Sequence, residues 1–289
     1  MIRNSTGQSY WSYPGSLYLA NQRHPWIGSD SEIRYQSLPA GTSIYGPHSF
    51  DYQFNELGFR CDSMIDPLQH RHRILWAGCS TTEGAGLPQD AVWCHRLTQR
   101  LREQLGDQSM PYWCVASGGI SMDWCLRQLS MLLPVIQPQV LVLWGPDPHR
   151  RELWFEAENP LDWVPNTGQQ HARRVLDVWT PAQVVHDTAG SLSIIHQLCK
   201  LLHTDLHWQI QCYTDKDQAR DLLQAVRYQI PDELKRKEFS SRMRVCDNAR
   251  DGMHAGPLSN GEFAQALWDE IGQDIATRLA GSAGPNKPW

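Results

Sequence analysis

The sequence predicts an α/β fold, a doubly wound parallel sheet inside a three-layer α/β/α sandwich. Two observations lead to this prediction. Four short apolar runs alternate with stretches of helical periodicity, which is the pattern of parallel strands joined by crossover helices. The third run, residues 140–144, is apolar throughout, as expected for a parallel strand that helices cover on both faces.

The expected core elements follow in chain order. Apolar residues at helical spacing mark the helices, and Gly106 marks the end of the first one. The expected strands are residues 73–77, 112–116, 140–144 and 208–213. The expected helices are residues 91–104, 124–133, 189–203 and 261–279, with helical pieces in the charged stretch 215–245.

The segments outside this core are less regular. Residues 1–50 are rich in Tyr, Ser, Pro and Gly, and they predict an irregular N-terminal arm packed on the main domain by its aromatic side chains. The main domain is expected over residues 51–280, and the tail 281–289 is expected to be disordered. Residues 145–183 follow a strand end and lack a clear period, so they predict either a lid or substrate wall or an insertion without function.

Composition fits one large globular domain. The 289 residues are 41% hydrophobic and 20% charged, and a net charge of −5 argues against the basic footprint of a nucleic-acid-binding protein. No apolar run reaches the roughly 18 residues of a membrane span, and the first residues lack the apolar segment of a secretory signal. We therefore expect a cytoplasmic protein that binds neither nucleic acid nor membrane, while its oligomeric state is not indicated.

Cysteine and histidine spacing predicts neither disulfides nor a metal site. None of the eight Cys forms a C-x-x-C pair, and several lie in apolar runs, which favours reduced thiols in the core. The nearest His pair, His70 and His72, lies in a charged loop before a strand. No phosphate-binding glycine motif is present, so we expect no cofactor.

The end of the first core strand carries a candidate nucleophile. The apolar run 74–77 ends at Gly78, and Ser80 and Glu83 follow at the entry to a helix. A hydroxyl there lies at the carboxyl end of a strand, where α/β folds bind ligands. The pattern Ser80-x-x-Glu83 is also that of a capping box, in which the hydroxyl only accepts a backbone N–H. This stretch alone leaves both interpretations open.

A second signal stands just before the last helix. Asp251 and His254 are three residues apart, so one turn would place both side chains on one face. An Asp can fix the tautomer of an imidazole, and the imidazole can then take a proton from a hydroxyl. The alternative is that Asp251 caps a turn and His254 lies on the surface.

The order of these blocks resembles that of the SGNH (GDSL-type) hydrolase family over about residues 51–280. The family's first block, G-D-S, stands here as Gly78–Ser80, and its last block as Asp251–Pro257. Gly119 follows the second strand, as in the family's second block. The segment Asn55–Arg60, NELGFR, is similar to one found upstream of the first block in many members.

The resemblance implies a flavodoxin-like fold and a serine hydrolase. Ser80 would be the nucleophile, His254 the general base and Asp251 its orienting partner. The backbone N–H groups of Ser80 and Gly119 would form the oxyanion hole. The expected substrate is a carboxylic ester, either a small molecule or an O-acyl group on a carbohydrate.

The sequence departs from the family pattern in two places. Cys79 stands where the family has a non-nucleophilic Asp, and its side chain should point away from that of Ser80, which disfavours it as a nucleophile. The third block lacks the Asn that serves the oxyanion hole, and residues 144–150 read WGPDPHR. Candidates to replace that Asn or to contact substrate are His149, Arg150 and Arg151.

The missing Asn leaves alternatives open. Loss of one oxyanion donor can lower the rate by roughly 10²–10³-fold. The chain could therefore be a catalytically weak or inactive module that binds a glycan or a protein partner on the same fold. A third hypothesis makes the 1–50 arm an assembly element, because that arm is rich in aromatic residues.

Overall fold

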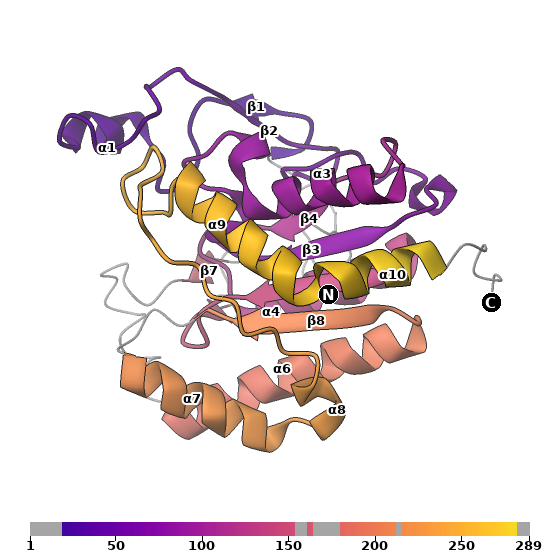
Figure 1. Ribbon diagram of the computed structural model, residues 1–289. Helices are drawn as coiled ribbons and strands as arrows, with labels where there is room; N and C mark the ends of the chain where they lie inside the picture. Colours follow the sequence, from indigo (N-terminus) through magenta and orange to yellow (C-terminus); the bar gives the residue numbers. More distant parts are fainter. Residues whose placement is uncertain (1–18, 154–160, 164–179, 212–215, 282–289) are drawn as a thin grey trace, which may run out of the picture.

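A parallel sheet of four strands forms the centre of the molecule, as the computed structural model shows (Figure 1). Its strands are β3 (Ile74–Gly78), β4 (Trp113–Ala116), β5 (Val140–Gly145) and β8 (Asp205–Ile210). Their spatial order, β4-β3-β5-β8, follows the flavodoxin-like pattern, so the predicted fold class is confirmed. The structure describes residues 19–153, 161–163, 180–211 and 216–281.

Helices cover both faces of the sheet (Figure 1). On one side, α3 (Trp93–Leu105) packs against α9 (Pro257–Leu267) and α10 (Gln273–Gly281), with one π-helical turn, η5 (Trp268–Gly272), between the last two. On the other side, α4 (Met122–Ile136) packs against α6 (Pro181–Leu201), which contacts α7 (Lys216–Gln229). The short helices are α2 (Ser80–Glu83), α8 (Asp232–Lys235) and the 3₁₀ turns η3 (Pro67–Gln69) and η4 (Gln89–Ala91).

A cluster of aromatic rings joins the sheet to the α3 and α9 layer. Trp93 packs edge to face on Trp76, with ring centroids 5.4 Å apart, and on Trp144, at 5.7 Å. Phe263 of α9 contacts Trp93 at 5.4 Å and Trp144 at 4.4 Å. Such buried rings contribute large apolar areas and specific ring geometry to a core. Trp76, Trp93 and Trp144, three of the thirteen Trp residues of the sequence, therefore belong to the core.

Several element boundaries differ from the sequence prediction. Helix α6 begins at Pro181 rather than 189, because Thr180 accepts from Gln183 N at 3.2 Å as its N-cap and Pro181 occupies the first turn. Strand β8 ends at Ile210 rather than at residue 213. The final helical stretch starts at Pro257 rather than 261.

The stretch 145–183 is not wholly without regular structure. Strands β6 (Arg151–Leu153) and β7 (Leu161–Trp163) pair antiparallel within it. Residues 154–160 and 164–179 lie outside the described residues, so the lid hypothesis stays a prediction. The tail beyond residue 281 also lies outside them.

The described part of the N-terminal arm is ordered against the main domain. Strand β1 (Arg23–His24) pairs antiparallel with β2 (Tyr52–Gln53), across the boundary expected at residue 50. Helix α1 (Glu32–Ser37) begins after Ser31, whose side chain accepts from Arg34 N. Figure 1 shows this arm at the top of the molecule, above the loop that leads into α9.

Two further findings concern the described residues only. None of their helices is both long and apolar enough to span a membrane. Seven of their cysteines are free thiols, and all of these except Cys246 are buried.

Candidate active site

The turn from β3 into α2 places Ser80 at the carboxyl edge of the sheet. A Cβ on Gly78 would lie 2.2 Å from Thr82 Oγ1 and 2.7 Å from Trp144 O, so only glycine allows this approach. Cys79 is the N-cap of α2, and its carbonyl accepts from the N–H groups of Thr82 and Glu83, both at 2.9 Å. Ser80 is thus the first residue of the helix, and its side chain makes no cap.

Ser80, His254 and Asp251 form one chain of hydrogen bonds. Ser80 Oγ lies 2.8 Å from His254 Nε2, and His254 Nδ1 lies 2.6 Å from Asp251 Oδ2. With the proton on Nδ1, the ring donates to Asp251 and accepts from the Ser80 hydroxyl. Because Cys79, and not Ser80, is the N-cap of α2, the capping-box interpretation of Ser80 is wrong. His254 is held by both partners, with only 17% of its side chain exposed.

The Asp251 carboxylate is buried and hydrogen-bonded at both oxygens. Oδ1 accepts from the backbone N–H of Met253 and of His254, each at 3.0 Å. Oδ2 accepts from His254 Nδ1 and from Ser29 Oγ, the latter at 2.8 Å. Burial acts to raise the pKa of Asp251, but the hydrogen bond and charge of His254 and the two backbone N–H groups outweigh it and lower that pKa. Asp251 is therefore a carboxylate at neutral pH.

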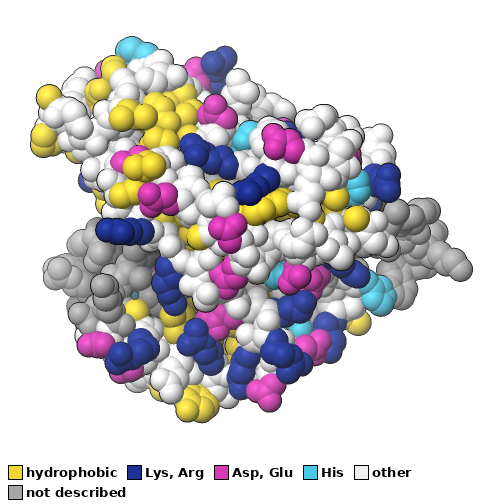
Figure 2. Space-filling model, in the orientation of Figure 1, with side chains coloured by type: hydrophobic (Ala, Val, Ile, Leu, Met, Phe, Trp, Pro, Cys, Tyr) yellow, Lys and Arg dark blue, Asp and Glu magenta, His cyan; other side chains and the backbone are white. Residues whose placement is uncertain are grey.

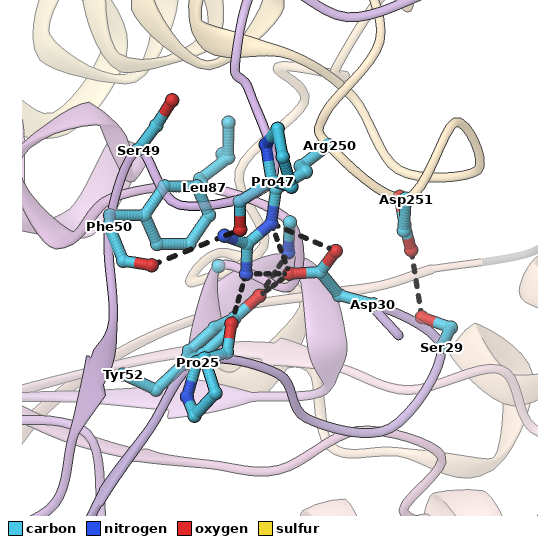
Figure 3. Close-up of polar contacts among 12 residues, drawn as sticks. Pro25, Ser29, Asp30, Pro47, Ser49, Phe50, Tyr52, Leu87, Arg250 and Asp251 are labelled. Carbon is cyan, nitrogen blue, oxygen red and sulfur yellow. Dashed lines mark hydrogen bonds and ion pairs between the residues drawn. The ribbon is translucent and has the colours of Figure 1, made fainter. Parts of the chain in front are cut away.

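The N-terminal arm reaches this site, which the sequence did not indicate. Arg250 is fully buried, and its guanidinium pairs with Asp30, with Nη2 to Oδ2 at 2.6 Å (Figure 3). The guanidinium stacks between the rings of Trp26 and Phe50, at 4.0 and 3.9 Å from their centroids. It also donates to the carbonyls of Pro25, Pro47 and Phe50.

The loop after β4 lies beside Ser80. A Cβ on Gly118 would be 3.8 Å from Ser80 Cβ and 3.4 Å from Glu83 Oε2. Gly119 has a φ of 78°, in the left-handed region that favours glycine. The loop is thus close to Ser80, and the oxyanion role of the Gly119 N–H stays a prediction.

Glu83 is a second buried carboxyl next to this loop, with 6% of the residue exposed. Burial raises the pKa of Glu83 to about 7, although the charge of Arg60, a hydrogen bond from Gly118 N–H and the charge of His254 act to lower it. Arg60 donates to the Glu83 and Gly84 carbonyls at 3.1 and 2.7 Å. The sequence pattern marked Glu83 only as a possible capping residue.

Two of the three candidates for the missing third-block Asn, His149 and Arg151, bind carboxylates. The backbone N–H and Nδ1 of His149 donate to Asp147 Oδ1 at 2.9 and 3.0 Å, and this hydrogen bond raises the pKa of His149. Arg151 is buried and pairs with Asp187 at 3.0 Å and Asp123 at 3.5 Å. The backbone N–H of Arg150 donates to Asp147 O. Which of these groups, if any, faces a substrate stays a prediction.

Cys79 points to a different partner from Ser80. Its Sγ donates to Gln211 Oε1 at 2.8 Å, and Gln211 Nε2 donates to Thr81 Oγ1 at 3.1 Å. Cys79 is fully buried. This geometry agrees with the expectation that the two neighbouring side chains point apart.

A cavity of about 250 Å³ opens beside His254. Apolar walls come from Trp144, Val245 and Met253, and polar ones from Gln211 and Arg242, among others. Of the described residues that line it, Arg242 is the only one with a permanent charge. Val245 and Met253 are 62% and 58% exposed, so the cavity opens through an apolar rim.

No protein-family model matches the chain, and no curated protein matches it in sequence. Several solved structures are similar. TesA is 14% identical, with a TM-score of 0.45 over 70% of this chain and 98% of that chain. The psychrotrophic esterase EstA from Pseudoalteromonas sp. is 12% identical, with a TM-score of 0.47 over 70% and 97%. A GDSL-like lipase from Bacteroides thetaiotaomicron is 15% identical, with a TM-score of 0.41 over 71% and 88%. With identities this low, any functional conclusion depends on the site itself.

Proposed function

We propose that the protein is a serine hydrolase that cleaves carboxylic esters through an acyl-enzyme. The observation that carries this proposal is the continuous hydrogen-bond chain from Ser80 Oγ to His254 at 2.8 Å and from His254 to Asp251 at 2.6 Å. A serine within hydrogen-bond reach of an imidazole that is itself oriented by a carboxylate is the geometry of an activated nucleophile.

The steps follow from the positions of these three groups. Ser80 Oγ attacks the ester carbonyl while His254 Nε2 takes its proton. Asp251 stabilises the imidazolium that forms. The imidazolium then gives its proton to the leaving alcohol, which produces the acyl-enzyme. Water attacks this ester while His254 takes the water proton, and the proton returns to Ser80 as the acid leaves.

Negative charge develops on the carbonyl oxygen during the attack by Ser80 and again during the attack by water, and hydrogen-bond donors must stabilise it. We assign this role to the backbone N–H of Ser80, at the start of α2, and to that of Gly119. The cavity beside His254 would hold one side of the ester, and its volume of about 250 Å³ suits a small acyl group or part of a sugar. An O-acyl group on a carbohydrate is the substrate class that we favour.

One observation favours a second function. At the position where a third donor is expected, the chain has Pro146 and the buried Asp147, which accepts from His149 instead of donating to an oxyanion. A carboxylate there would disfavour a developing negative charge. The alternative is therefore a catalytically weak or inactive module that binds a glycan or a protein partner in the same cavity.

Labelling with a fluorophosphonate probe tests the proposal. We expect the probe to modify Ser80 in the wild type, with labelling lost in Ser80→Ala and reduced by more than about 10³-fold in His254→Ala, because the nucleophile loses its base. The modified peptide is identified by mass spectrometry. Hydrolysis of p-nitrophenyl acetate should fall in parallel.

Two controls make the outcome clear. Ser130→Ala changes an exposed hydroxyl that donates to Leu126 O on α4, and it should label like the wild type. Cys79→Ser tests the neighbouring thiol and should keep the label on Ser80. A folded wild type that takes no label would contradict the hydrolase and favour the binding module, which glycan-binding assays would then address.

A further inference from the structure

The N-terminal arm supplies a fourth side chain to the hydrogen-bond chain of the site. Ser29 Oγ donates to Asp251 Oδ2 at 2.8 Å (Figure 3). The same oxygen accepts from His254 Nδ1. The other oxygen, Oδ1, is already engaged by two backbone N–H groups of the residues that follow Asp251. Ser29 is thus the one described partner of the Asp251 carboxylate that lies outside its own loop.

The position of Ser29 is fixed by its neighbour. Asp30 follows Ser29, Arg250 precedes Asp251, and these two flanking residues form a fully buried ion pair. Tyr52 OH also donates to Asp30, at 2.5 Å. Two adjacent residues of the arm therefore bind two adjacent residues of the catalytic loop. In addition, Arg34 Nε donates to the Asp251 carbonyl at 2.8 Å.

We propose that Ser29 is a positioning residue for Asp251, and that the arm completes the active site through Ser29 and Asp30. This inference depends on the proposed function, since it gives Ser29 a role in the same reaction. The hydroxyl keeps the Asp251 carboxylate in the plane that His254 Nδ1 requires. It also shares the negative charge of Oδ2, which sets how strongly that oxygen favours the imidazolium.

Removal of the hydroxyl has two expected consequences. A hydrogen bond to a charged group is worth enough that kcat should fall about tenfold in Ser29→Ala, with KM nearly unchanged because Ser29 does not touch the substrate. This is far less than the roughly 10⁴-fold loss that follows when the carboxylate itself is lost from such a triad. The freed charge on Oδ2 should also move the titration of His254 to higher pH.

The experiment compares three variants with the wild type. Ser29→Ala removes the hydroxyl, and Ser29→Thr keeps it. Ser37→Ala is the matched control, because Ser37 is exposed in the same arm and donates within that arm, to Arg34 O. Each variant is measured for kcat and KM with p-nitrophenyl acetate, and for thermal unfolding. NMR of ¹⁵N-histidine-labelled protein follows the titration of His254, whose signals are assigned with His254→Ala.

Support would be a fall in kcat for Ser29→Ala alone, rescue by Ser29→Thr and a shifted His254 titration at an unchanged unfolding temperature. The other charged groups that face His254, Glu83 and Arg242, are intact in every variant. Unchanged kcat and unchanged His254 titration in Ser29→Ala would overturn the proposal. If the wild type itself neither labels nor hydrolyses, the proposed function fails, and the NMR titration still decides whether Ser29 acts on Asp251.

Discussion

At the scale of single residues, burial decides which carboxyls near Ser80 are charged at neutral pH. Asp251 has strong donors at both oxygens, so its pKa is lowered despite burial. Glu83 is also buried, but the charges and the hydrogen bond that act to lower its pKa do not offset burial, which raises the pKa from 4.5 to about 7. Between pH 4.5 and 7, Glu83 is therefore protonated in the folded protein and ionised in the unfolded chain.

This difference makes stability depend on pH. Where the folded state binds more protons than the unfolded state, the free energy of unfolding falls as pH rises. Between pH 4.5 and 7, we expect the free energy of unfolding of the wild type to fall by up to about 3 kcal/mol relative to that of Glu83→Gln, since each pKa unit is about 1.4 kcal/mol. Urea unfolding at several pH values measures this loss.

The control for Glu83 is Glu103→Gln, which changes an exposed carboxyl on α3. The difference in unfolding free energy between this variant and wild type should stay nearly constant over the same pH range. An equally flat difference for Glu83→Gln would mean that the Glu83 carboxyl is already ionised in the folded protein at pH 4.5 to 7.

At the scale of elements, the junction of β3 and α2 sets the position of Ser80. Gly78 lies so close to Thr82 and to the Trp144 carbonyl that neighbouring groups would have to move for any side chain. We expect Gly78→Ala to lower the free energy of unfolding by about 1–3 kcal/mol, the usual effect of overpacking. Labelling of Ser80 should also slow, because α2 begins two residues after Gly78.

Helix α6 offers the matched glycine. Gly190 lies inside this helix, and a Cβ there would meet nothing within 4 Å. Gly190→Ala should raise stability by about 0.5–1 kcal/mol, because alanine loses less conformational entropy in a helix. Thermal and urea unfolding of both variants provide the comparison. A stabilising effect of Gly78→Ala would contradict the tight turn described here.

At the scale of the whole molecule, one buried ion pair joins the N-terminal arm to the domain that carries Ser80. Asp30 and Arg250 are both fully buried. On the outer face in Figure 2, by contrast, Lys and Arg side chains are interspersed with Asp and Glu. Exposed pairs of that kind contribute little to stability, whereas loss of one partner from a buried pair leaves an uncompensated charge.

We therefore expect Asp30→Asn to lower the free energy of unfolding by about 3–5 kcal/mol. The control is Arg23→Ala, which breaks an exposed pair with Asp51 that also joins the arm to the domain, and it should cost less than about 1 kcal/mol. Urea unfolding measures both. Equal effects of the two variants would show that the arm is a loosely attached appendage.

The sequence predicted much of the fold and the central residues of the site. Continuous apolar runs and helical periodicity are local properties, so the four core strands were found, with small errors at their ends. Ser80 and His254 are 174 positions apart, yet each stands in a recognisable local pattern at a strand or helix boundary. The start of α6 was missed because its capping signal at Thr180 lies within an irregular stretch.

The sequence by itself determined the order of strands and helices, the placement of Ser80 after a strand and the spacing of Asp251 and His254. The tertiary structure decided that Cys79 caps α2, which frees the Ser80 hydroxyl for His254. It also decided that Ser29 and Asp30 contact the loop that carries Arg250 and Asp251, and that Glu83 is buried. Periodicity is encoded by neighbouring residues, whereas desolvation and contacts between distant segments exist only once the whole chain has packed.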